Sequence, residues 1–347
     1  MDNAVLKNSF QRTQKWDILK FIMIFLVVLG HAADYYTPVN EKMRALFLVI
    51  YAVHMPVFIF VSGLFSKRTV NEKRTNKLFG YIVLYLALKF LPFIYRFSES
   101  DFPGISIFKE GSAPWFMLAL FAFNLITMFL KDRSPKFVLI FSIFLACFAG
   151  YDMNIGDFLA LSRIIVFYPF FYLGYITDRE NLEKLCENKK IRITAAVVIA
   201  VFIAVVFIFT DKLYWMRALL TGRSSFAVFS GNAGRFGGLI RLGYYAVVSL
   251  LGFSVIALTP SKTPSGIMAK LGQRTLSVYA FHFTLLYLFY DKFNCKELIG
   301  QALGRGGDWL IIPVSIIITL LLSASIFDKF LAFIMNASAP ATKRSDN

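Results

Sequence analysis

The three histidines of the chain are the side chains best suited to acid–base chemistry, and each lies in or beside an apolar segment. His31 ends the stretch WDILKFIMIFLVVLGH, His54 opens HMPVFIFVSGLFSK, and His282 lies within LGQRTLSVYAFHFTLL. The helical rise places all three at the middle to outer depth of a membrane. Ionisable groups at that depth usually face a polar cavity, so three at one depth favour a functional site. For any single ring, a structural hydrogen bond is the alternative.

The spacing of Lys20 and His31 predicts that both side chains share one face of a helix. Eleven residues turn an α-helix by three turns plus about 20° and separate the two positions by roughly 16 Å along the axis. Asp17 lies close to the same line. We therefore expect a stripe of ionisable groups that faces a cavity. The alternatives are that Lys20 reaches the headgroups and that His31 is a hydrogen-bonded packing residue.

The elements that must position these side chains are apolar segments of membrane-spanning length. The chain has 347 residues, of which 57% are hydrophobic, and this excess falls in blocks. We predict an all-α membrane protein, a bundle of about ten transmembrane helices in one domain, 1–336, followed by a disordered tail, 337–347. The predicted spans are 16–36, 45–66, 78–97, 114–130, 137–150, 158–177, 192–210, 239–259, 272–290 and 309–335.

The distribution of basic residues predicts the orientation. With the N-terminus in the cytoplasm, the inner segments hold 23 of the 37 lysines and arginines and the outer loops hold 12. This bias predicts cytoplasmic N- and C-termini in a plasma (bacterial inner) membrane. The net charge of +16 is then explained without nucleic acid. The basic loop 211–241, which this orientation places outside, has two possible explanations. It is either a long loop, in which the preference of basic residues for the cytoplasmic side weakens, or a site that faces an anion.

Other features narrow the class of protein. The cysteines lie far apart and outside any CxxC motif, and the histidines form no HxxxH pair, so we expect neither a disulfide framework nor a metal site. The first apolar stretch could mimic a signal peptide, but Asp17 and Lys20 lie within or beside it and many apolar segments follow. We therefore expect a retained first span.

Five segments in order resemble the integral-membrane acyltransferase 3 family. The first-span stretch quoted above matches the family's basic residue followed by histidine, at Lys20 and His31 with ten residues between them, and the segments around His54 and His282 resemble its second and late spans. APWFMLALF and RIIVFYPFFYLGY are most similar to the branch of fucose 4-O-acetylase-like enzymes. The resemblance covers nearly the whole chain, and the 211–238 region matches least.

The resemblance implies transfer of an acetyl or other short acyl group from cytoplasmic acyl-CoA, usually acetyl-CoA, to a hydroxyl of a lipid-linked or cell-surface saccharide. In that chemistry His31 would be the general base, with Asp34 either its orienting partner or a helix-end residue. Donors to the thioester oxygen would come from Arg163, His54, His282 or Tyr279, with Ser62 a weaker choice. Arg163 is the first choice because arginine is costly in lipid; reaching the outer headgroups is its alternative.

The donor's phosphates would need basic partners at the cytoplasmic mouth. The candidates for this donor-binding group are Lys20, Asp17, Arg68, Lys73 and Arg74. Direct transfer needs one proton transfer and is simpler than a covalent acyl-histidine. The rival function is a transporter or flippase for a small anionic or lipid-linked substrate, although no inverted repeat is evident. The sequence leaves open the sugar, the acyl group and the oligomeric state.

Overall fold

The computed structural model describes residues 14–96, 106, 108–111, 113–229 and 231–337. Within these residues the regular elements are helices, and the only strand-like pairing is one isolated bridge between Lys109 and Phe158. The first helices run as α1 (Gln14–Asp34), α2 (Glu41–Tyr51), α3 (His54–Leu64), α4 (Lys67–Asn71), α5 (Thr75–Arg96), α6 (Trp115–Leu130), α7 (Pro135–Ala149), α8 (Leu161–Ile176) and α9 (Arg179–Glu187). The remainder are α10 (Lys189–Ile208), α11 (Thr210–Leu213), α12 (Arg217–Leu220), α13 (Gly237–Leu258), α14 (Ile267–Gly272), α15 (Thr275–Tyr287), α16 (Cys295–Leu303), α17 (Ile311–Leu322) and α18 (Ser325–Ala337).

Each of the ten predicted apolar segments falls on helix, but ten transmembrane helices are not confirmed. Within the described residues, five spans are long and apolar enough to cross a membrane, or six if α17 and α18, bent by 55°, form one. Helices α6, α7 and α8 are apolar but shorter, at 15 to 16 residues. The second predicted span is divided between α2 and α3, which the sequence pattern did not indicate. The predicted tail lies, apart from Ala337, outside the described residues.

Exposed apolar helices identify a membrane protein. Helix α10 is the clearest case, because only 11% of its apolar 18-residue stretch is buried inside the protein. Large apolar side chains such as Ile193, Val197 and Val201 are more than half exposed there. A helix that is apolar on its outer faces is stable in lipid and not in water.

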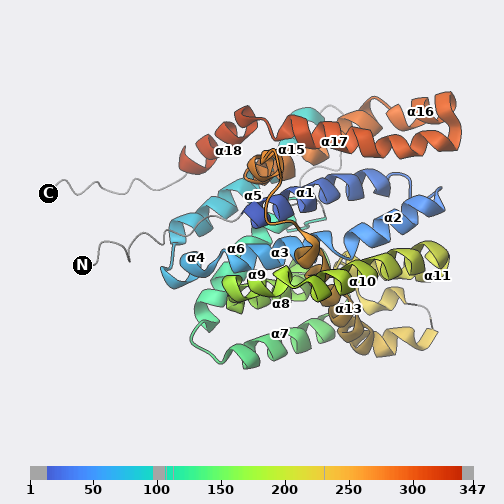
Figure 1. The fold of residues 1–347 in the computed structure, drawn as a ribbon. Coiled ribbons are helices and arrows are strands. Elements are labelled where there is room, and N and C mark those ends of the chain that lie inside the picture. The colour runs from blue at the N-terminus through green and yellow to red at the C-terminus, as the bar shows by residue number, and fades with distance from the viewer. Residues whose placement is uncertain (1–13, 97–105, 107, 112, 230, 338–347) are drawn as a thin grey trace.

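Helix α1 lies at the centre of the bundle. It contacts α2, α3, α14, α15 and α17. Of its apolar 18-residue stretch, 67% is buried inside the protein. Figure 1 shows α1 enclosed between the α15–α17 group and the α2–α3 pair, with its first residues at the end of the molecule that also carries α4 and α18. The opposite end carries α11 and α16. Lys20 and His31 therefore lie toward opposite ends of one buried helix.

Two glycines bring α3 and α8 into backbone contact. A Cβ atom added to Gly63 would overlap the carbonyl oxygen of Phe171, and one added to Gly174 would overlap that of Phe60. Small residues at such crossings allow close helix packing in membranes. This contact joins the helix that carries His54 to the helix that carries Arg163.

We expect Gly63→Ala and Gly174→Ala each to lower stability by about 1–3 kcal/mol, because the added methyl group forces the two backbones apart. The measurement is the thermal unfolding midpoint of the purified protein in detergent. Gly243→Ala on α13 is the control, because a Cβ there meets no atom within 4 Å. Equal midpoints for all three variants would contradict the packing role.

Candidate active site

A cavity of about 680 Å³ lies at the His31 end of α1. We call it the outer cavity, after the side of the membrane on which the basic residues predict it to lie. Its wall combines the end of α1, helices α2, α3, α8 and α15, and the segment 214–223 that follows α11. This volume is within the usual range for small-molecule sites. The lining residues used below are His31, Asp34, Arg44, Tyr51, His54, Trp115, Arg163, Tyr214, Arg217, Thr221, Arg223 and Phe283.

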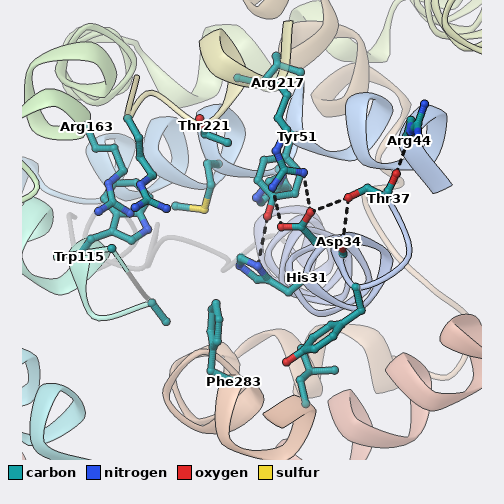
Figure 2. A pocket seen from close by; sticks show the side chains of 18 of the residues that line it. His31, Asp34, Thr37, Arg44, Tyr51, Trp115, Arg163, Arg217, Thr221 and Phe283 are labelled. Carbon is teal, nitrogen blue, oxygen red and sulfur yellow. Dashed lines mark hydrogen bonds and ion pairs between the residues drawn. The ribbon is translucent and has the colours of Figure 1, made fainter. Parts of the chain in front are cut away.

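His31 faces this outer cavity and is held by a tyrosine. Its Nδ1 lies 3.2 Å from the hydroxyl of Tyr51, which comes from the last turn of α2 (Figure 2). The ring also packs against Phe283, with ring centroids 4.5 Å apart. Tyr51 reaches His31 because α2 returns antiparallel to α1 after a short turn. The imidazole is therefore fixed at one nitrogen.

The three histidines gather in one cluster, as the shared depth predicted. The His31 and His282 rings are 5.4 Å apart, and Tyr51 packs edge-on against His54 at 4.6 Å. His54 Nδ1 lies 2.8 Å from the carbonyl of Ile50, and His282 Nδ1 lies 2.8 Å from that of Tyr279. A carbonyl oxygen only accepts hydrogen bonds, so Nδ1 carries the proton in both rings. In the neutral form of each ring, Nε2 then has a free lone pair. This tautomer suits an acceptor rather than the donor role expected for His54 and His282.

Asp34 binds an arginine from the outer loop. Its carboxylate accepts two hydrogen bonds from Arg217, at 2.5 and 3.0 Å, and one from Thr37 at 3.1 Å. Figure 2 shows this pair beside the His31–Tyr51 contact. In the described part of the chain the His31 ring nitrogen pairs with Tyr51, whereas Asp34 anchors the segment that carries Arg217. The bidentate geometry makes this a directional contact.

Arg163 forms the opposite wall of the cavity. Its side chain is 4% exposed, so it does not reach the headgroups. It donates to the backbone carbonyl of Glu110, approaches Asp157 at 3.6 Å and lies over the ring of Trp115 at 4.9 Å. Its Nε has no hydrogen-bond partner in the described part of the protein. Arg163 therefore retains one buried N–H donor.

Carboxylates accompany the cations around this cavity. Asp157 accepts two hydrogen bonds from Arg223, at 2.8 and 2.5 Å. The carboxylate of Glu110 pairs at 2.8 Å with Lys89, the lysine inside the third predicted span, and both side chains are buried. Paired charges are the form in which ionised groups are tolerated in an apolar interior. The outer site is thus polar without being a bare cationic patch.

A second, smaller cavity of about 190 Å³ lies near the other end of α1. We call it the inner cavity, after the side that the basic residues predict to be cytoplasmic. Lys20 lines it and forms an ion pair with Asp17 at 2.8 Å, as expected from their shared stripe. Its remaining lining includes Ser62, Lys77 and Asn124. Lys20 therefore faces a cavity, although a quarter of its side chain remains exposed.

The other predicted donor-binding cations do not line this inner cavity. Arg68 and Arg74 both donate to Glu72, at 2.9 and 2.7 Å. The hydrogen bonds from Arg74 and Arg68 lower the pKa of the Glu72 carboxyl, which lies outside the membrane-spanning helices. Lys73 is exposed and adopts a left-handed backbone conformation with φ of 47°. The cation that joins Lys20 at the cavity is Lys77, which the sequence analysis did not select.

Aromatic rings lie between the two cavities, which have no lining residue in common. Phe58 closes the inner cavity on α3, and its ring packs against Phe116 at 5.6 Å. Phe116 in turn packs against Tyr279 at 5.5 Å, and the Tyr279 ring lies 6.2 Å from that of His282. The structure therefore shows two cavities along α1, whereas we expected the Lys20–His31 stripe to face a single cavity.

Several site residues were missed because no local pattern identifies them. The tertiary arrangement brings Tyr51, Lys77 and Asn124 to the cavity walls, and it brings Glu110 and Asp157 to Arg163. The excess of arginine in the 211–241 loop was the one available signal, and it did point to Arg217 and Arg223. Across the described residues, no group of three or more potential ligands has a geometry that could hold a metal ion.

We expect Asp34→Asn to increase amide hydrogen exchange in residues 214–222 by up to about fivefold, because a partly exposed ion pair contributes at most about 1 kcal/mol. Asp211→Asn is the matched control, since it breaks the pair of Arg44 with a carboxylate that is 68% exposed. Exchange that responds equally to both changes would show that Asp34 does not anchor this segment.

Comparison with known proteins assigns the family. No curated protein and no solved structure matches the chain. The family model described as an acyltransferase domain matches residues 14–328, which is most of the chain and includes both cavities. The protein therefore belongs to the acyltransferase 3 family of membrane acyltransferases.

Proposed function

We propose that the protein is an O-acyltransferase that moves an acetyl or other short acyl group from cytoplasmic acyl-CoA to a hydroxyl of a lipid-linked or cell-surface saccharide, with His31 as the general base. The observation that carries the proposal is the position of the His31 ring. It lines a cavity large enough for an acceptor and is fixed at Nδ1 by Tyr51. A base held at one nitrogen can present the other to a substrate hydroxyl.

The proton inventory follows from that contact. If the Tyr51 oxygen accepts from Nδ1–H, the neutral His31 ring has a free Nε2 lone pair. Nε2 takes the proton of the acceptor hydroxyl as its oxygen attacks the thioester carbonyl. The C–S bond then breaks, and the departing thiolate takes the proton from the imidazolium. The unused Nε–H of Arg163 is the donor we assign to the oxygen on which negative charge builds.

The outer cavity supports a polyhydroxylated acceptor. Most of its cations are paired with carboxylates, although Arg163 and Arg223 share Asp157, so it offers many hydrogen-bond donors and acceptors with little unpaired charge. Trp115 and Tyr214 add aromatic faces to the lining. A saccharide has hydroxyls that both donate and accept hydrogen bonds, and it has apolar C–H faces that pack on aromatic rings. Such a lining can bind both features. This favours a neutral or weakly charged sugar over the strongly anionic ligand suggested by the basic loop.

The inner cavity is where we place the acyl donor. Lys20 lies at the end that the basic residues predict to be cytoplasmic, and about 16 Å of helix rise separates it from His31. A thioester on a long, thin arm suits that distance. Transfer requires the rings of Phe58 and Phe116 to move aside. The plasma-membrane location, the cytoplasmic termini and the fucose 4-O-acetylase-like branch belong to the same proposal.

We expect His31→Ala to reduce transfer by about 10²- to 10⁴-fold, the usual contribution of a general base, without loss of membrane insertion. The measurement is transfer of radiolabelled acetyl from acetyl-CoA to cell-envelope glycan by purified protein. His31→Gln keeps a hydrogen-bonding group near Tyr51 but has no nitrogen that titrates, so it should be equally inactive. An active His31→Gln protein would assign His31 a packing role.

We expect Lys20→Ala to raise the KM for acetyl-CoA by about tenfold with little change in kcat, because it removes a cation near the donor's phosphates. S-acetylpantetheine, which has no nucleotide phosphates, should be used equally well by both proteins. Lys67→Ala is the control, because Lys67 donates to the carbonyl of Thr177 and lines neither cavity. A parallel loss with both donors would mean that Lys20 acts through its ion pair with Asp17.

A further inference from the structure

The inner cavity contains a buried acceptor that the proposed chemistry does not use. Asn124, on α6, is 2% exposed and lines this cavity. Its Nδ2 donates to the carbonyl of Leu120 at 2.7 Å. Because a carbonyl only accepts, this bond fixes which side-chain atom is nitrogen. The remaining atom, Oδ1, has no hydrogen-bond partner in the described part of the protein.

A buried oxygen without a partner can contribute to ligand binding when the ligand places an N–H or O–H donor within hydrogen-bond distance of it. A buried acceptor without a partner is destabilising, and a ligand N–H that reaches it recovers the lost hydrogen bond. Asn124 lies six residues before Leu130, the end of α6, so it is about 9 Å deeper than that end. The acceptor is thus inside the bundle, at the same distance of six residues from the helix end as Lys20 on α1.

The lining of the cavity combines cations, an amide and aromatic rings. Lys77 lies two residues from the start of α5, whereas Lys20 and Asn124 each lie six residues from the nearer ends of α1 and α6, and Phe58 contributes an aromatic ring. Lys77 donates to the hydroxyl of Thr69 at 3.2 Å, and no carboxylate of the described chain lies within ion-pair distance of it. The cavity therefore offers cations for phosphates, an amide acceptor for an amide N–H group and apolar rings, which are the kinds of contact that a CoA-type donor can use.

We propose that the inner cavity binds the amide-bearing arm of the acyl donor, with Asn124 Oδ1 accepting a hydrogen bond from one of the arm's amide N–H groups. This inference rests on the proposed function and adds the donor's amide to what is recognised. A volume of about 190 Å³ is below the range of whole-ligand sites, so the cavity holds a segment of the arm.

The test compares three acetyl donors with wild-type protein and Asn124→Leu. Acetyl-CoA and S-acetylpantetheine both carry the amides, whereas S-acetylmercaptoethanol has none. We expect Asn124→Leu to lower kcat/KM about tenfold for the first two donors, the equivalent of one hydrogen bond, and to leave the third unchanged. Thr127→Val, one turn further along α6, is the matched control, because its hydroxyl bonds within the bundle and lines neither cavity.

A second measurement needs no variant and so does not depend on Asn124→Leu folding. Wild-type protein is given two S-acetylpantetheine analogues, each with one amide N–H replaced by an ester oxygen of the same shape. We expect one of them to lose about tenfold in kcat/KM. Equal use of both analogues and the parent donor would overturn the inference and assign Asn124 Oδ1 to water. Wild-type protein that transfers acetyl from none of the donors would instead refute the proposed function.

Discussion

The cost of holding ionised groups inside an apolar bundle governs this structure. Five ion pairs of the described residues lie along the interior and its outer edge: Asp17 with Lys20, Asp34 with Arg217, Glu110 with Lys89, and Asp157 with both Arg163 and Arg223. Three of them, Asp34–Arg217, Glu110–Lys89 and Asp157–Arg223, join segments distant in sequence. The helices are therefore positioned by apolar packing and aligned by a few directional polar contacts.

Helix α1 connects the two ends of the proposed reaction. Its buried position leaves Lys20 and His31 facing different cavities, and its neighbours supply what each side chain needs. Helix α2 provides Tyr51, and helix α6 provides both Trp115 and Asn124. The close contact of α3 with α8, permitted by glycines on both, sets the distance between the His54 and Arg163 walls of the outer cavity.

The sequence was informative where a property is local or periodic. It located helix in every predicted apolar segment, the shared face of Asp17 and Lys20, and the clustering of three histidines, because depth and angle follow from residue spacing. It did not reveal the division of α2 from α3 or the partners of Arg163, which depend on loops folding back over the bundle. Arg68, Lys73 and Arg74 were predicted from their charge and from their place in the loop at the predicted cytoplasmic end, and neither property specifies which side chain enters a cavity.

The ring layer formed by Phe58, Phe116 and Tyr279 has a consequence for the cell as well as for the reaction. In the proposed arrangement the two cavities open toward opposite faces of the membrane, and a continuous opening between them would let protons leak across it. The rings would then have to block ions while letting a small acyl group pass. The proposed reaction and the barrier function of the membrane would thus place opposite demands on the same few side chains.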